Sequence, residues 1–214
     1  MTVLFLAHRL LLSYMPGKVE RLKNLGDCEL EMKNQKGFSL IELLIVVVII
    51  GIIAAIAIPN LLAARRAANE GSAVSSLRTL HGAQMTYSAT NGAGNFSGAI
   101  GAGTAASLAE LGPDGPAGVG LGPHLIDAVL ASATKSNYNF VGGRTVAAAN
   151  APATFFYSAV PTAGQGLTQT GTRRFGVATP GVIYQDPTAA NLTTQFADEA
   201  AMVALVAPAG PLSN

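Results

Sequence analysis

Residues 38–62 read FSLIELLIVVVIIGIIAAIAIPNLL and contain one charged residue, Glu42. A helix needs about 20 consecutive apolar residues to cross the hydrocarbon core of a bilayer, and this run is long enough. We therefore expect it to form a membrane-spanning helix. A secretory signal peptide is the alternative, but the apolar region of such a peptide is usually only about 7–15 residues long and ends at a small-residue cleavage site.

The composition of the whole chain agrees with a membrane-seeking segment. Half of the 214 residues are hydrophobic, 12% are charged, and the net charge is +1. This apolar fraction is too high for a disordered chain. The 13 basic residues nearly balance the 12 acidic ones, which argues against a generally basic nucleic-acid-binding domain.

Basic residues before the apolar run predict its orientation. Cytoplasmic flanks of membrane helices carry an excess of Lys and Arg, so the N-terminus is expected to be cytoplasmic and the C-terminal part to lie across the membrane. The only cysteine, Cys28, precedes the run, so the exported part would contain no disulfide. The basic residues of this N-terminal segment are Arg9, Lys18, Arg21, Lys23, Lys33 and Lys36.

The segment KGFSLIELLIVVVIIGIIAAIAIPN, residues 36–60, resembles the N-terminal signature of type IV pilins and of the related pseudopilins of type II secretion. A basic stretch precedes Gly37 and Phe38, Glu42 is the fifth residue after that junction, and Pro59 lies in the apolar run. In this family a prepilin peptidase cuts after the glycine on the cytoplasmic side, and the new first residue is N-methylated. The resemblance implies cleavage after Gly37 and methylation of Phe38.

Glu42 is the residue for which we predict an assembly role. A carboxylate inside an apolar helix is costly, so it is normally paired or functional. Glu42 lies one turn into the helix, where it could meet the free α-amino group of a neighbouring subunit and set the axial register of a helical homopolymer. The alternative is an interfacial glutamate whose carboxylate reaches the lipid headgroups.

Gly51 and Pro59 are candidates for a kink in the apolar helix. Proline removes a backbone hydrogen bond and clashes with the preceding turn. An ordinary proline kink of a membrane helix is one interpretation. The family resemblance adds another, in which this region loosens when subunits pack into a filament.

Residues 1–37 are interpreted as a leader that is absent from the mature protein. MKNQKG, which begins at Met32, would by itself make a short leader typical of the family. Residues 1–31 match no leader that we would expect. We prefer a translation start placed too far upstream over a genuinely long leader.

The helix is expected to continue as an amphipathic segment over residues 63–90 and to stop at NGAGN, residues 91–95. A semi-apolar stripe at three- and four-residue spacing predicts the face that packs on a globular head. Its members are Val74, Leu77, Leu80 or His81, Gln84 and Tyr87. The opposite face would carry Arg65, Arg66, Glu70, Ser72 and Arg78.

Residues 91–214 are expected to form an exported, β-rich head. The Gly- and Pro-rich residues 91–123 predict a long loop, and residues 125–132 a short helix. Strands are predicted at residues 137–141, 154–160, 173–178 and 181–185, the last two joined as a hairpin by ATPG. Residues 201–212 form a final strand or a tail. The expected fold is α+β, with three or four antiparallel strands packed on the amphipathic half-helix; this is the pilin fold that the resemblance implies.

Enzyme chemistry finds little support, and we predict no catalytic residue, metal or cofactor. His81 and His124 lack partners at ligand spacing and are interpreted as surface or packing histidines. Asp186, Asp198 and Glu199 fit no calcium-loop motif and are interpreted as a solvated acidic cluster. GAGTAA, residues 101–106, lacks the third glycine and preceding strand of a nucleotide-binding loop.

Nucleic-acid binding is weakly supported. The basic pairs Arg65–Arg66 and Arg173–Arg174 could contact DNA phosphate, as in pilins used for DNA uptake. Two basic pairs in a near-neutral domain are weak evidence for DNA binding. Arg65 and Arg66 are better explained as residues at the outer surface of the membrane, with their stems along the helix.

The sequence therefore predicts a structural subunit of a type IV pilus. The precursor would be anchored in the bacterial inner membrane and processed there by a prepilin peptidase and N-methyltransferase. The pilus or type II secretion machinery would then polymerise it into an extracellular filament. The alternatives are a type II secretion pseudopilin and a minor tip pilin that binds DNA or a surface.

Overall fold

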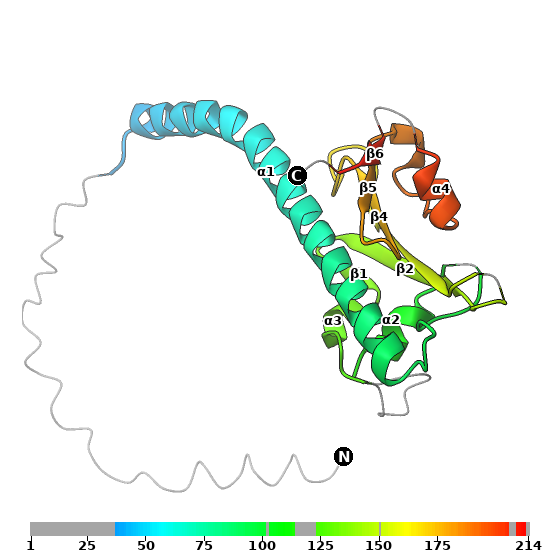
Figure 1. Ribbon diagram of the computed structural model, residues 1–214. Helices are drawn as coiled ribbons and strands as arrows, with labels where there is room; N and C mark the ends of the chain where they lie inside the picture. The colour runs from blue at the N-terminus through cyan, green and yellow to red at the C-terminus, as the bar shows by residue number, and fades with distance from the viewer. Residues whose placement is uncertain (1–36, 102, 114–122, 150, 206–208, 213–214) are drawn as a thin grey trace, which may run out of the picture. The chain divides into compact units, whose positions relative to one another are not determined.

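The computed structural model describes residues 37–101, 103–113, 123–149, 151–205 and 209–212. The chain divides into two compact units, Met1–Ile49 and Ile50–Asn214, which are described separately. Helix α1 (Leu40–Thr90) begins in the first unit and ends in the second (Figure 1). The predicted long helix that ends near Thr90 is confirmed. The predicted leader lies outside the described residues, except for Gly37.

The second half of α1 packs on the head through one face. Its buried residues recur at three- and four-residue spacing, as expected for one face of a helix. Leu77, Leu80 and Gln84 are buried as predicted, whereas Val74 and Tyr87 are only partly covered. Glu70 was assigned to the opposite face, and this assignment is wrong. The buried residues of α1 are Glu70, Ala73, Ser76, Leu77, Leu80, Ala83 and Gln84.

The head is built on a six-stranded antiparallel sheet whose strands follow one another in chain order. Each strand pairs with the next, and in the β2–β3 pair Tyr138 lies opposite Pro161 and Thr145 opposite Thr154. The four predicted strands are present, and the predicted hairpin is the β4–β5 pair. Two short edge strands complete the sheet, β1 and β6. The strands are β1 (Thr134–Lys135), β2 (Tyr138–Thr145), β3 (Thr154–Pro161), β4 (Arg174–Ala178), β5 (Ile183–Asp186) and β6 (Gly210–Pro211).

Short helices lie in the connections. Helix α2 (Ala106–Leu111) falls within residues 91–123, so the prediction of a continuous loop there is wrong. The segment turns helical because Ser107, Leu108 and Leu111 lie on one buried face. Helix α3 (Ala128–Ala131) confirms the predicted short helix in a shorter form. The 3₁₀ helix η2 (Ala189–Asn191) and α4 (Glu199–Val203) follow β5.

The core lies between α1 and one face of the sheet. Leu77 and Leu80 of α1 belong to the same buried cluster as Phe140, Phe155 and Tyr157. A smaller cluster, formed by Phe156, Ala178, Phe196 and Met202, includes the β3 residue between Phe155 and Tyr157. Successive side chains of a strand point to opposite faces, so both faces of β3 are covered. The predicted α+β fold is confirmed.

Gly142 of β2 is required by the packing of this core. It lies opposite Tyr157 in the β2–β3 register, and a Cβ atom at residue 142 would lie 2.2 Å from the Tyr157 ring. The ring is fully buried and has no room to move. Only a glycine therefore lets the aromatic core of the sheet close at this point.

Candidate functional site

The Gly37–Phe38 junction lies immediately before α1 and is accessible. Phe38 is 85% exposed. A Cβ atom at residue 37 would meet nothing within 4 Å. The described residues around this junction therefore leave the peptide bond open to an approaching protease.

Glu42 belongs to the first turn of α1 and caps it. Its Oε2 accepts a hydrogen bond of 2.9 Å from the backbone N–H of Ser39. This is the bond that the glutamate of a capping box makes, and it satisfies a donor that the start of a helix leaves unpaired. The carboxylate side chain is otherwise exposed, so it remains open to a partner.

The first half of α1 exposes a continuous apolar surface. It is the helix of the described chain that is long and apolar enough to cross a membrane. Each large apolar side chain from Leu40 to Leu61 is at least 51% exposed. An exposed apolar surface of this extent is typical of a membrane or protein contact.

Gly51 and Pro59 lie inside α1, which continues through both residues. A Cβ atom at Gly51 would meet nothing within 4 Å. The Asn60 side chain donates a hydrogen bond of 3.2 Å to the carbonyl of Ile56, one turn earlier. Pro59, the residue before Asn60, has no backbone N–H to donate. A kink or opening here stays a prediction.

An ion pair anchors the middle of α1 to the head. Glu70 accepts hydrogen bonds from the guanidinium of Arg173 at 2.9 Å and 2.6 Å, and from the backbone N–H and hydroxyl of Thr172 at 2.7 Å each. Burial raises the pKa of Glu70, but the bonds from Thr172 and Arg173 outweigh burial and hold the pKa below its usual value. The carboxylate is therefore charged at neutral pH.

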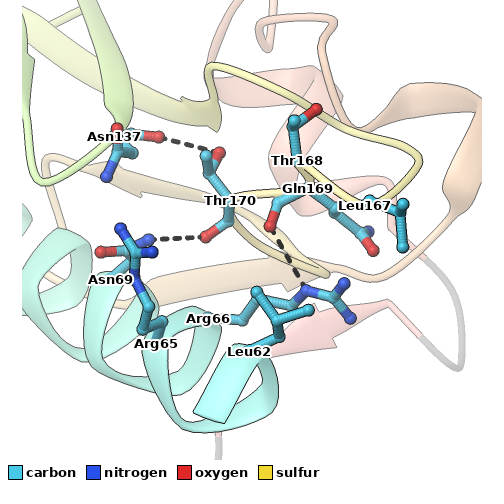
Figure 2. Close-up of a pocket in the computed structure, with 9 residues that line it drawn as sticks. All are labelled: Leu62, Arg65, Arg66, Asn69, Asn137, Leu167, Thr168, Gln169 and Thr170. Atoms are coloured by element: carbon cyan, nitrogen blue, oxygen red, sulfur yellow. Dashed lines mark hydrogen bonds between the residues drawn. The ribbon is translucent and has the colours of Figure 1, made fainter. Parts of the chain in front are cut away.

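Two further side chains of α1, one a turn before Glu70 and one directly before it, hold the same head segment. Arg66 donates from Nε to the carbonyl of Gln169 at 3.3 Å, and Asn69 donates to the carbonyl of Thr170 at 2.9 Å (Figure 2). Together with the ion pair of Glu70, these bonds fix the connection between β3 and β4 along α1.

A buried polar network holds the far end of the same helix. Gln84 donates from Nε2 to the hydroxyl of Tyr157 at 2.6 Å and of Ser97 at 2.8 Å, and its Oε1 accepts from the Ser97 N–H at 2.9 Å. Burial raises the pKa of Tyr157 to about 12, against the opposite effect of its hydrogen bonds. The phenol stays protonated, and the network serves the fold.

Arg174 and Asp186 form a buried ion pair between β4 and β5. The Arg174 Nε donates to Asp186 at 2.8 Å, its Nη2 lies 2.7 Å from the same carboxylate oxygen, and the two side chains are 9% and 1% exposed. Asp186 is therefore no member of a solvated acidic cluster, and that interpretation is wrong for it. Arg173 and Arg174 are both engaged in ion pairs, and a contact of this pair with DNA phosphate stays a weakly supported prediction.

The comparison with known protein families finds a known motif in the N-terminal segment. Residues 32–58 carry the prokaryotic N-terminal methylation motif. The match includes Gly37, Phe38 and Glu42 and covers the start of α1. It ends at Ile58, so the motif does not describe the head.

Relatives are found among pilus and secretion proteins. The chain is 69% identical over 39 residues to the type IV wide pilus major component PilA4 of Thermus thermophilus, which covers 18% of this chain and 30% of that protein. It is 38% identical over 60 residues to the type II secretion system core protein G of Klebsiella pneumoniae, covering 28% and 43%. It is 48% identical over 52 residues to the type IV major pilin protein PilA of Myxococcus xanthus, covering 24% of each.

The likeness is confined to part of each protein. The chain spans less than half the length of these curated relatives. No solved structure matches it. The family match ends at Ile58, so the head has to be understood from its own geometry.

The other candidate residues lie away from the methylation motif. His81 packs against Phe155 with ring centroids 5.6 Å apart, and its Nε2 lies 3.2 Å from the carbonyl oxygen of Thr179. His124 adopts a positive φ of 53° ahead of α3. Asp198 accepts a hydrogen bond of 2.7 Å from the N–H of Ala201 and caps α4, next to Glu199. In the GAGTAA segment, Thr104 bridges to Gly142 of β2.

Two features of the site were missed from the sequence. The capping bond between Ser39 and Glu42 could have been predicted, because the sequence has the S-x-x-E spacing of a capping box. The Glu70–Arg173 pair could not, because 103 residues separate the two and only the fold brings them together.

Proposed function

We propose that this chain is a prepilin, which is cleaved after Gly37, N-methylated at Phe38 and assembled as a structural subunit of a type IV pilus. The observation that carries the proposal is the methylation motif of residues 32–58, joined to an exposed Gly37–Phe38 junction at the start of a long apolar helix. The similarity to PilA4 and PilA supports the same assignment.

The proposed parts of the chain follow from this processing. Residues 1–37 form the leader, residues 38–62 the membrane and filament-core helix, residues 63–90 its amphipathic continuation, and residues 91–214 the exported head. Before assembly the subunit is anchored in the inner membrane, with its N-terminus cytoplasmic and its head periplasmic. A prepilin peptidase and N-methyltransferase processes it, and the pilus assembly machinery extracts it from the membrane.

Assembly is proposed to rest on the apolar half of α1 and on Glu42. Exposed apolar side chains of neighbouring subunits would bury one another in the filament core, and this keeps them out of water once the subunit leaves the membrane, at about 25 cal/mol per Å² of apolar surface shielded from water. The Glu42 carboxylate, which already accepts the Ser39 N–H, has room for a second donor. The α-ammonium group of a neighbour's Phe38 is that donor, and the pair sets the register of the subunits. The chain catalyses no reaction in this role.

A second candidate is a pseudopilin of type II secretion. It is favoured by the similarity to core protein G of Klebsiella pneumoniae and of Vibrio cholerae, at 38% and 39% identity. The two candidates share processing, membrane anchorage and helical assembly. They differ in whether the subunit is abundant in long surface filaments.

The test compares wild type with Gly37→Ala by immunoblot of sheared surface filaments and of membranes. Since a Cβ at residue 37 meets nothing within 4 Å, any effect of the alanine reports on the peptidase rather than on the fold. We expect a larger, unprocessed chain in the membrane and no filaments. Gly51→Ala is the control, because its Cβ also has free space, and it should be processed to the mature size. Normal filaments from Gly37→Ala would contradict the proposal.

A further inference from the structure

A pocket of about 280 Å³ lies between α1 and the segment that joins β3 to β4 (Figure 2). All nine residues that line it belong to the described part of the second unit, and none of them is acidic. Leu62, Arg65, Arg66 and Asn69 line it from α1, and Leu167 and Thr170 are among those that line it from the facing segment.

The pocket carries positive charge that the protein does not neutralise. In the described chain the salt bridges join Lys135 to Asp127, Arg173 to Glu70 and Arg174 to Asp186, and neither Arg65 nor Arg66 takes part in one. Glu70 is one turn away, but its carboxylate is taken by Thr172 and Arg173. Arg66 uses only its Nε toward Gln169, which leaves the outer nitrogens of its guanidinium free to donate to an anion.

The lining is also amphipathic. Leu62 ends the apolar run of α1, and Leu167, on the opposite wall, is 86% exposed. A single exposed leucine is common on a protein surface, so its position in this pocket is what matters. Next to two arginines it matches a ligand with an anionic head and an apolar body.

The position along α1 identifies the source of such a ligand. The helix rises 1.5 Å per residue, so Arg65 and Arg66 lie about 5 Å beyond the last apolar residue, Leu62. The headgroup layer on each side of a bilayer is about 5–7 Å thick. With the apolar run in the membrane, the pocket faces the phosphates of the outer leaflet.

We propose that this pocket binds the phosphate of an anionic phospholipid and seats the head on the membrane before assembly. Arg65 and Arg66 bind the phosphate, while Leu62 and Leu167 contact the glycerol and the first methylenes of the acyl chains. The inference rests on the proposed membrane anchorage, since a subunit without it would not hold the pocket at this depth. The bound lipid bridges α1 and the β3–β4 connection, and so protects the backbone of that connection.

The experiment measures hydrogen–deuterium exchange of the full chain in lipid nanodiscs made of phosphatidylcholine alone or with phosphatidylglycerol. We expect the amides of residues 163–172 to exchange about fivefold or more slowly with phosphatidylglycerol, as a single arginine near an anionic surface already contributes a factor of about this size. Arg65→Gln/Arg66→Gln should abolish this difference. Arg78→Gln removes an exposed arginine of α1 outside the pocket and should retain it.

Three controls make each outcome decisive. Amides of residues 73–84 report the packing of α1. If the double variant loses their protection, the single variant Arg65→Gln is used instead, because no side-chain hydrogen bond of Arg65 is found among the described residues. Equal exchange of residues 163–172 in both lipids, or a lipid response that survives the arginine substitutions, would overturn the inference. Full protection by inorganic phosphate in phosphatidylcholine discs would overturn the lipid as the source. A chain that does not enter the discs would contradict the membrane anchorage itself, and the inference with it.

Discussion

Glu70 on α1 and Arg173 before β4 are joined by two hydrogen bonds across 103 residues of sequence. The glutamate is buried, whereas the arginine side chain is 38% exposed. This pair lies in the second half of α1, beyond the apolar run. The second half of α1 is thus held on the head through a specific polar contact as well as through the apolar core.

The first prediction concerns this contact. Glu70→Gln removes the charge that Arg173 and Thr172 recognise, so the free energy of unfolding of the head should fall by about 1.5–3 kcal/mol. Chemical denaturation of the full chain in detergent, followed by circular dichroism, measures the loss. Arg78→Gln, an exposed change on the same helix, should stay within about 0.5 kcal/mol of wild type. A Glu70→Gln variant as stable as wild type would show that the ion pair does not stabilise the packing of α1 on the head.

The second prediction is the response of this stability to acid. The pKa values of Glu70 and Asp186 are both held below their usual values, in spite of burial, by bonds from Thr172 and Arg173 and from Thr188 and Arg174, respectively. The unfolded chain therefore binds protons at a higher pH than the folded one, and the stabilisation is complete at neutral pH. It should be lost as the pH falls below ~4. The free energy of unfolding should fall less steeply with decreasing pH in Glu70→Gln than in wild type. The same pH dependence in both proteins would contradict a lowered pKa of Glu70.

The third prediction compares a buried with an exposed ion pair. Arg174→Ala leaves the carboxylate of Asp186, 1% exposed, without its charged partner, and it also removes a contact with the Phe196 ring 4.0 Å away. A loss of about 3–5 kcal/mol is expected. Lys135→Ala breaks the exposed pair with Asp127 and should cost at most about 1 kcal/mol. Equal losses in the two variants, measured by denaturation, would contradict the structural role of Arg174.

Glu42 allows its charge to be separated from its role as a helix cap. Gln fits the last position of a capping box as Glu does, so Glu42→Gln keeps the bond to Ser39 and removes only the charge. We expect Glu42→Gln and Glu42→Ala to be processed alike, and each to yield at least about tenfold fewer filaments, because the neighbour's α-ammonium is left unpaired. Counting filaments by electron microscopy checks this. If Glu42→Gln assembles as wild type does while Glu42→Ala does not, the cap and not the charge is what assembly needs.

Local patterns were enough to predict the main elements. The apolar run predicted the first half of α1, strand-like runs separated by turns predicted β2 to β5, and the spacing of Leu77, Leu80 and Gln84 predicted the packing face. Helix α2 was missed because glycines and prolines on both sides concealed a six-residue helix whose buried face forms only against the head. The edge strands β1 and β6 have two residues each, too few for any periodicity.

The roles of charged residues were harder to predict than the fold. Glu70, Arg174 and Asp186 look like solvent-exposed residues in the sequence, since charged side chains are rarely buried without partners. Their partners lie 12 to 103 residues away, and tertiary structure alone brings them together. The Gly37–Phe38 junction and Glu42 could be proposed from the sequence because their signal is local, within a single motif, and their roles stay predictions.

The central claim is tested most directly by the intact mass and N-terminal sequence of this protein in mechanically sheared surface filaments. We expect an abundant species that begins at N-methylated Phe38. A processed species confined to the membrane fraction would favour the pseudopilin. A chain in which residues 1–37 are still attached to Phe38 would contradict the account, because neither cleavage nor methylation would then take place at this motif.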